Sequence, residues 1–188
     1  MKKVAVFLAD GFEEGESLFV IDVLRRAGIH CDSVSIAGEM VRGSHDIVVK
    51  ADKIIGDEIK EYDMIVFPGG LPGATNLRDD ERVIELVKYF DKVPEKFVAA
   101  ICAAPMILER AGIVKGRKLT SYPGDKYIEL LKEANYVDDI VVIDDHLITS
   151  RGPATTLPFA YALIDALGGD SSKLKQGMLY NMLRESNF

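Results

Sequence analysis

The chain has 188 residues, 48% of them hydrophobic, and a formal net charge of −7 at pH 7. This length and composition predict one domain, residues 1–188, with a sizeable core. The negative charge argues against a nucleic-acid-binding surface. No apolar stretch is long enough to span a bilayer, the chain starts without a leader-like segment, and two cysteines are too few for a disulfide scaffold. We therefore expect a cytoplasmic protein with no membrane partner.

Short apolar runs alternate with amphipathic stretches along the chain, which is typical of an α/β protein with a mostly parallel sheet and helices on both faces. His146 follows Asp144-Asp145 between two late runs, so one antiparallel hairpin is expected. The runs predict strands over 3–8, 31–36, 63–67, 97–101, 118–120, 140–143 and 147–150. The amphipathic stretches predict helices over 14–27, 80–91, 103–111, 124–134, 154–167 and 171–181.

Two of these helices have a predicted packing face. The helical spacing in the first places Leu18, Ile21, Val23 and Leu24 together, and the spacing in the last does the same for Leu174, Met178, Leu179 and Met182. Helical spacing of apolar side chains is more often a packing surface than a functional one.

Cys102 is the residue that points most directly to chemistry, because the apolar run 97–101 ends on it and small residues follow at once. A strand that stops at Ile101 and a helix that starts near Ala103 place Cys102 at the turn between them. The free amides at the start of a helix favour a thiolate over a thiol, and Pro105 fits the first helical turn. The alternative is a buried, unreactive cysteine. The small residues next to Cys102 favour a reactive cysteine over a buried, unreactive one.

Three more loops follow predicted strands, and ligands bind to such sheets beyond the carboxyl ends of the strands. A glutamate-rich segment, 13–16, follows the first strand, and Pro68-Gly69-Gly70 follows the strand over 63–67. The glycines allow backbone amides to face a bound anion. Arg151, after the hairpin, either holds a ligand carboxylate or anchors a loop.

These four segments, 13–16, 68–70, 99–105 and 149–153, resemble in the same order the ThiJ/PfpI superfamily, in the branch of the Parkinsonism-associated deglycase (DJ-one) and its bacterial relatives. The resemblance covers essentially the whole chain. It implies a flavodoxin-like three-layer α/β/α sandwich, similar to class I glutamine amidotransferases. It also implies a homodimer whose active sites lie close to the subunit interface.

The resemblance further implies that Cys102 is the nucleophile and Glu16 the acid beside it. It places the backbone amides of Gly70 and Ala103, next to Gly69, where the family stabilises negative charge. For Glu16 the alternative is a solvated acid on the first turn of a helix.

The two other glutamates of segment 13–16, Glu13 and Glu14, are interpreted either as residues at the lip of the site or as solvated charges. Cys31, at the start of the second strand, is interpreted as a structural thiol.

The cysteine and the acid must titrate together. An ionised Glu16 raises the pKa of the Cys102 thiol by repulsion, whereas a protonated Glu16 can donate a hydrogen bond to the thiolate. Our hypothesis is that near neutral pH the pair keeps one proton on Glu16 and the negative charge on Cys102.

Two positions depart from the family pattern. Tyr122 stands where many members have a histidine, and a tyrosine is a poor base at neutral pH, which weakens the case for a cysteine peptidase or amidotransferase. His45 stands where the branch often has an arginine facing the partner's site. It is either a proton acceptor across the interface or an exposed loop histidine. The spacing of the histidines is not that of metal ligands, and we expect neither a metal nor another cofactor.

Two function classes remain. In the first, Cys102 adds to a small reactive dicarbonyl such as methylglyoxal, or to its glycated adducts, and Glu16 moves a proton. This is the chemistry of a glutathione-independent glyoxalase (glyoxalase III) or deglycase in carbonyl-stress defence. In the second, peroxide oxidises Cys102 to a sulfinate, and the protein is an oxidative-stress sensor or a redox-regulated chaperone. The fold alone does not choose between them.

Overall fold

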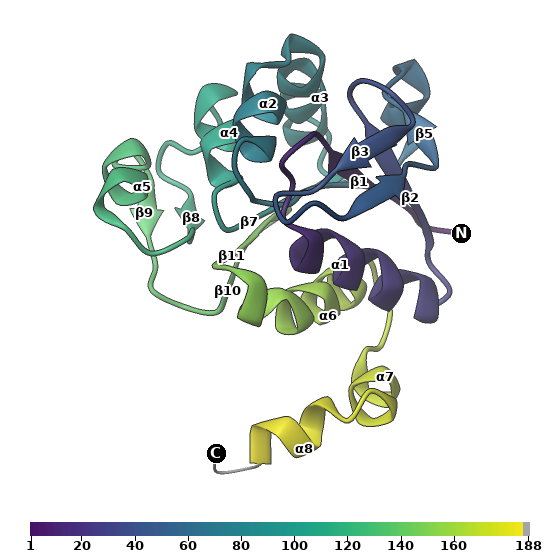
Figure 1. Ribbon diagram of the computed structural model, residues 1–188. Helices are drawn as coiled ribbons and strands as arrows, with labels where there is room; N and C mark the ends of the chain where they lie inside the picture. The colour runs from purple at the N-terminus through teal and green to yellow at the C-terminus, as the bar shows by residue number, and fades with distance from the viewer. Residues whose placement is uncertain (186–188) are drawn as a thin grey trace.

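The computed structural model describes residues 1–185, which form a seven-stranded sheet, two small two-stranded sheets and flanking helices (Figure 1). The strands of the main sheet are β1 (Lys3–Leu8), β2 (His30–Ser35), β5 (Lys53–Ile54), β6 (Met64–Phe67), β7 (Phe97–Ile101), β10 (Val141–Asp144) and β11 (Leu147–Ser150). The small sheets are the pair β3 (Met40–Arg42) and β4 (Val48–Lys50), and the pair β8 (Lys118–Leu119) and β9 (Asn135–Tyr136).

The main sheet has the strand order β10-β11-β7-β6-β1-β2-β5. Its strand pairs are parallel except for β10 and β11, which form an antiparallel hairpin with His146 in the turn. The expected hairpin is therefore confirmed. The expected strand over 118–120 is found as β8, but it pairs with β9 outside the main sheet.

Helices cover both faces of this sheet. The helices of the described residues are α1 (Glu14–Arg26), α2 (Gly73–Asp79), α3 (Glu81–Asp91), α4 (Pro105–Arg110), α5 (Asp125–Leu130), α6 (Thr156–Ala166), α7 (Ser172–Gly177) and α8 (Tyr180–Glu185), with 3-10 turns at Asp57–Glu61 and Pro153–Thr155. In Figure 1, α1 and α6 lie together on one side of the sheet, and α2, α3 and α4 lie on the other. These three layers confirm the flavodoxin-like sandwich. No helix among the described residues is long and apolar enough to cross a membrane.

Alternate residues of each central strand enter two separate cores. In β1, Ala5 and Phe7 pack with the side chains of α2, α3 and α4, whereas Val4 and Val6 pack with those of α1 and α6. Because both faces are covered, the central strands are continuous apolar runs in the sequence. The side chain of Cys102 is partly buried and packs against both of these cores.

The predicted packing face of the first helix is correct except at Leu18. The predicted residues Ile21, Val23 and Leu24 are buried together with Ser17 and Val20, whereas Leu18 has 38% of its surface exposed. The prediction that Leu18 is buried with them is therefore wrong.

The predicted tail helix over 171–181 is two helices, α7 and α8, because the backbone of Leu179 is left-handed, with a φ of +61°. Leu174 and Met178 pack against the core as predicted. Leu179 and Met182 are 62% and 65% exposed, so their predicted burial is wrong. Figure 1 shows α7 and α8 at the edge of the molecule, with α8 extending beyond α6.

Candidate active site

Cys102 lies at a sharp elbow between β7 and α4. Its backbone is left-handed, with a φ of +64°, which is uncommon for a residue with a side chain. Its amide donates to the carbonyl of Ser150 at 3.1 Å, and its carbonyl accepts from the amide of Tyr122 at 2.8 Å. The helix begins at Pro105, slightly later than the predicted start near Ala103. The neighbouring segments therefore hold the elbow on both sides.

Glu16 reaches this elbow from the first turn of α1. The residue is 1% exposed, so the alternative of a solvated acid is wrong. Its Oε2 accepts from the amide of Gly69 at 2.7 Å, and its buried Oε1 has no hydrogen-bond partner among the described residues. Burial raises the pKa of Glu16 from 4.5 to about 7, against the opposing effects of the Gly69 amide and the Cys102 thiol. A carboxyl with this pKa can both hold and release a proton near neutral pH.

Gly69 is the point at which the site converges. A Cβ atom at this position would lie 2.7 Å from Cβ of Cys102, 2.8 Å from Oε2 of Glu16 and 3.0 Å from the amide nitrogen of Ala103. These three groups therefore surround one small volume, and a side chain at position 69 would collide with all of them. Only glycine allows the acid to approach the cysteine so closely.

Gly70 is constrained differently. Its φ is +85°, and a Cβ atom would collide with the backbone of Gly11, Phe12 and Glu13. The amides of Ala103 and Gly70 both donate toward the sulfur of Cys102. The structure thus brings the predicted backbone donors together around the thiol.

The pKa of the Cys102 thiol moves in the direction opposite to the one that the turn alone predicts. Burial, and then the charge and hydrogen bond of Glu16, raise the pKa, and the amides of Ala103 and Gly70 only partly oppose them. The expectation that the start of α4 suffices to favour a thiolate is therefore wrong. The repulsion disappears when Glu16 carries a proton, so the charge of Cys102 depends on the protonation of Glu16.

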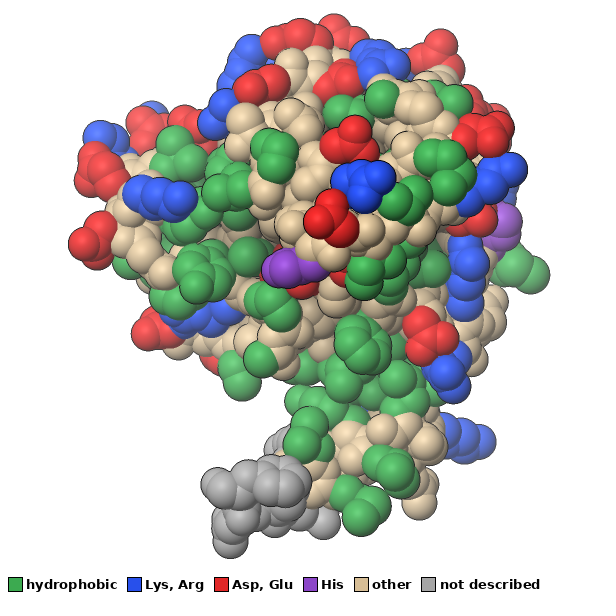
Figure 2. All heavy atoms as spheres, in the orientation of Figure 1, with side chains coloured by type: hydrophobic (Ala, Val, Ile, Leu, Met, Phe, Trp, Pro, Cys, Tyr) green, Lys and Arg blue, Asp and Glu red, His purple; other side chains and the backbone are tan. Residues whose placement is uncertain are grey.

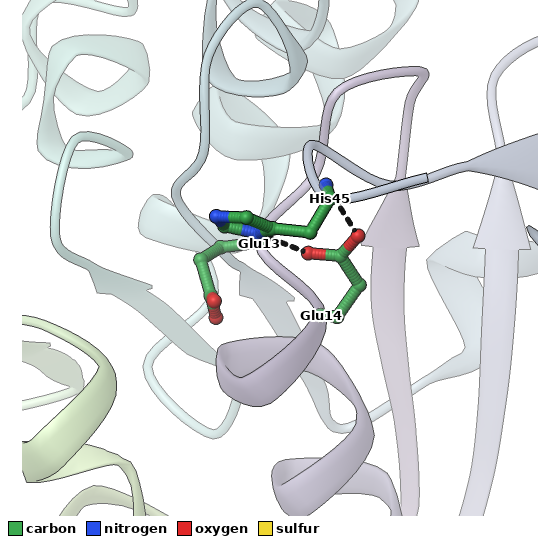
Figure 3. Close-up of side chains that lie close together, drawn as sticks. All are labelled: Glu13, Glu14 and His45. Atoms are coloured by element: carbon green, nitrogen blue, oxygen red, sulfur yellow. Dashed lines mark hydrogen bonds and ion pairs between the residues drawn. The ribbon is translucent and has the colours of Figure 1, made fainter. Parts of the chain in front are cut away.

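The two glutamates before Glu16 have defined partners. Glu13 caps α1, and its carboxylate accepts from the amide of Glu16 at 2.6 Å. Glu14 is 5% exposed and accepts from the amide of His45 at 2.7 Å and from its Nδ1 at 2.9 Å (Figure 3). Burial works to raise the pKa of Glu14, but the hydrogen bonds from His45 outweigh it and lower the pKa to about 2. Of the two interpretations considered for Glu14, that of a solvated charge is therefore wrong.

His45 lies on the turn between β3 and β4, and its side chain is 72% exposed. Glu13, Glu14 and His45 present possible metal-ligand atoms within 4.8 Å of one another. Their carboxylates and Nδ1 already bond to one another or to backbone amides. The sequence contains no direct signal for the contact between Glu14 and His45, which are 31 positions apart.

Tyr122 and Arg151 belong to the two segments that bond to the backbone of Cys102: the amide of Tyr122 bonds to its carbonyl, and Arg151 follows Ser150, which bonds to its amide. Tyr122 is 46% exposed, and its ring meets that of Tyr127 edge-on at a centroid distance of 6.0 Å. Arg151 forms an ion pair with Asp138. Of the two roles considered for Arg151, the structure favours the anchoring of a loop.

Cys31 is buried in β2 at 4% exposure, and burial raises the pKa of its thiol to about 12. It has the environment expected of a structural thiol.

The fold and these contacts define a class of α/β proteins in which a cysteine elbow and a buried carboxyl meet at the carboxyl ends of parallel strands. The model of the DJ-1/PfpI family matches residues 2–166. The chain belongs to the DJ-1/PfpI family.

Several relatives are similar to this chain over almost the whole length of both proteins. Protein dj-1beta of Drosophila melanogaster is 39% identical to this protein, over 89% of this chain and 90% of its own. A crystal structure of Drosophila melanogaster DJ-1beta is 38% identical and has a TM-score of 0.88, over 95% of this chain and 97% of that one. The glutathione-independent glyoxalase DJ-1 of Schizosaccharomyces pombe is 32% identical over 97% of this chain and 98% of its own. An oxidized DJ-1 of Toxoplasma gondii, 33% identical, has a TM-score of 0.86 over 95% and 98% of the two chains.

Proposed function

We propose that this protein is a glutathione-independent glyoxalase or deglycase of carbonyl-stress defence that uses Cys102 as its nucleophile and no cofactor. One observation carries the proposal: a buried carboxyl, Glu16, with a pKa of about 7 lies beside Cys102. This pair unites a nucleophile with a group that moves protons at neutral pH. The name of the Schizosaccharomyces pombe relative supports the same activity.

The proposed reaction on methylglyoxal has three steps. The sulfur of Cys102 adds to the aldehyde carbon and forms a hemithioacetal, while the amides of Gly70 and Ala103 stabilise the developing oxyanion. Glu16 then removes the proton from this carbon and returns it to the neighbouring ketone carbon, while the hydroxyl proton of the hemithioacetal passes to the former ketone oxygen, which leaves a thioester of lactate on the sulfur. Hydrolysis by one water molecule releases lactate and restores the thiol and the carboxyl.

A second candidate function is peroxide sensing through Cys102. Two equivalents of peroxide would convert the thiolate to a sulfinate and release two molecules of water. The amides of Gly70 and Ala103 and the carboxyl of Glu16 are positioned around the sulfur, where they can donate to sulfinate oxygens. An oxidised relative, from Toxoplasma gondii, has the same fold.

The test is lactate formation from methylglyoxal by wild type, Cys102→Ala and Glu16→Gln. We expect Cys102→Ala to be inactive, and Glu16→Gln to lose roughly 100-fold or more of the activity, the usual contribution of a general acid–base group. Cys31→Ala is the matched control, because it removes the other thiol and leaves the site intact. If wild type leaves methylglyoxal untouched while mass spectrometry after mild peroxide finds a sulfinate on Cys102, the sensor function replaces the enzymatic one.

The protein's partner is proposed to be a second copy of the chain. Phe19 on α1 is 49% exposed and Leu179 is 62% exposed, and Figure 2 shows hydrophobic side chains gathered over α1 and continuing onto α7 and α8. Apolar surface of this kind marks interaction sites. Sedimentation equilibrium of wild type and Phe19→Glu tests the proposal, and a monomeric wild type would contradict it.

A further inference from the structure

We propose that His45 is a positioning residue: through Glu14 it holds the first turn of α1 against the β3–β4 hairpin, and thereby keeps Glu16 in place against Gly69 and Cys102. We further propose that this hold depends on the positive charge of His45. The inference rests on the proposed pairing of Cys102 with Glu16, but it concerns the reactivity of the thiol and not the identity of the substrate.

The carboxylate of Glu14 is the connection between the hairpin and α1. In addition to the two bonds from His45, it accepts from Oγ of Ser44 at 3.2 Å. The His45 amide bonds to Oε1 and the His45 ring bonds to Oε2 (Figure 3), and Oγ of Ser44 also bonds to Oε2. Because both oxygens are used, the carboxylate cannot rotate without breaking at least one bond.

The backbone is fitted to the same contact. A Cβ atom on Gly43 would collide with the carboxylate of Glu14, so the hairpin reaches α1 only because position 43 is glycine. The amide of Ser44 donates to the carbonyl of Phe12 at 2.8 Å, and the amide of Gly11 donates to the carbonyl of Arg42 at 2.7 Å. The segment that leads into α1 is therefore bound to the hairpin at two further points just before Glu14.

The same helical turn carries Glu16 on another face. Glu14 points to the hairpin, while Glu16, two residues later, accepts from the amide of Gly69. Between them the turn is joined to the Gly69 segment by the bond from the Glu13 amide to the Gly69 carbonyl, at 2.9 Å. A displacement of this turn away from the hairpin would therefore move the carboxyl of Glu16 relative to the sulfur.

The charges around His45 are mostly negative. Glu14, Glu13 and Asp46 all face it, and Arg42 lies nearby in an ion pair with Asp46 at 3.3 Å. The hydrogen bond and charge of Glu14 raise the pKa of His45, and its exposed ring can exchange protons with solvent.

The protonated imidazole makes a charge-assisted bond to Glu14, which is about twice as strong as a neutral one. Because the pKa of His45 in the folded protein is raised, the stronger bond is present at low pH and is lost as the pH rises through that value. Loss of the charge also leaves Glu13 and Glu14 uncompensated on the turn that faces the thiol. A displaced Glu16 no longer donates a hydrogen bond to the thiolate when it is protonated, and the uncompensated charges repel a negative sulfur; both of these effects disfavour an anion on Cys102.

The experiment measures the rate of alkylation of Cys102 by iodoacetamide between about pH 6 and about pH 9, in wild type, His45→Gln and His45→Arg, with the adduct located by mass spectrometry. We expect His45→Gln to raise the apparent pKa of the thiol by about half a unit or more, which slows alkylation at neutral pH about threefold. His45→Arg should keep the wild-type rate at neutral pH and exceed it in alkaline solution, because guanidinium stays charged. His30→Gln, which changes another partly exposed histidine that bonds an aspartate, is the matched control and should leave the profile unchanged.

Two outcomes would overturn the proposal. One is a His45→Gln profile that superimposes on that of wild type, even if the melting temperature falls, since a purely structural residue would behave in this way. The other is a His45→Arg protein as slow as His45→Gln, which would exclude charge as the cause. Lactate formation from methylglyoxal is measured on the same preparations. If wild type forms none while the alkylation profiles shift as expected, the glyoxalase proposal fails and the positioning role of His45 stands.

Discussion

Replacing Glu16 by glutamine is expected to stabilise the folded protein above neutral pH. Glu16 is 1% exposed, and its burial raises its pKa from 4.5 to about 7. Glutamine has nearly the same shape, its carbonyl oxygen can accept the bond from the Gly69 amide, and it never ionises. The substitution therefore removes the cost of keeping a negative charge at this position.

The size of the effect follows from the pKa. A rise from 4.5 to about 7 corresponds to about 3 kcal/mol, because each pKa unit is worth about 1.4 kcal/mol. The folded-state pKa lies above the unfolded one, so the stabilisation by the protonated form is complete at acid pH and is lost as the pH rises through about 7. The free energy of unfolding of Glu16→Gln minus that of wild type should therefore increase by about 3 kcal/mol between about pH 4 and about pH 8.

Urea denaturation at several pH values provides this difference curve, in which the titration of groups that are not coupled to Glu16 cancels. Glu85→Gln, on the exposed face of α3, is the matched control and should give a flat curve. A flat curve for Glu16→Gln as well would show that the carboxyl is not destabilised in the folded state. The account of Glu16 as a group that carries a proton at neutral pH would then be wrong.

Three further substitutions probe the geometry of the site. Gly69→Ala should slow alkylation of Cys102 at least about tenfold and lower the free energy of unfolding by about 1–3 kcal/mol, because the new Cβ would lie 2.7 Å from that of Cys102. Gly38→Ala is the control, since a Cβ there meets nothing within 4 Å. Gly43→Ala should destabilise the protein by about 1–3 kcal/mol through its collision with Glu14, as measured by urea denaturation. Arg151→Ala should release the loop that carries Asp138, so hydrogen exchange of amides 137–140 should accelerate while that of β7 stays unchanged.

The core and the elbow are predictable from the sequence for a simple reason. Strands buried on both faces, such as β1 and β7, are continuous apolar runs, and the run over 97–101 ends directly on Cys102. The glycines at 69 and 70 are equally visible, because a close approach and a left-handed turn both require glycine. The principal parts of the candidate site can therefore be located before the fold is known.

Other features depend on contacts that a local pattern does not contain. The β3–β4 hairpin has strands of three residues each, too short for a clear alternation, and α2 covers the weakly apolar sequence Gly73–Asp79. The bond between Glu14 and His45 joins residues 31 positions apart, so neither residue shows in the sequence what it binds. The pKa of Cys102 is misjudged for a similar reason. The start of α4 is a local feature, but the burial that outweighs it comes from both cores.

The position of Cys102 between the two cores has a consequence for any adduct on its sulfur. Atoms added to the sulfur enter a side-chain environment that belongs to both cores, so an adduct is expected to change the packing of both. The thermal transition of the whole protein should therefore report what is attached to one sulfur atom.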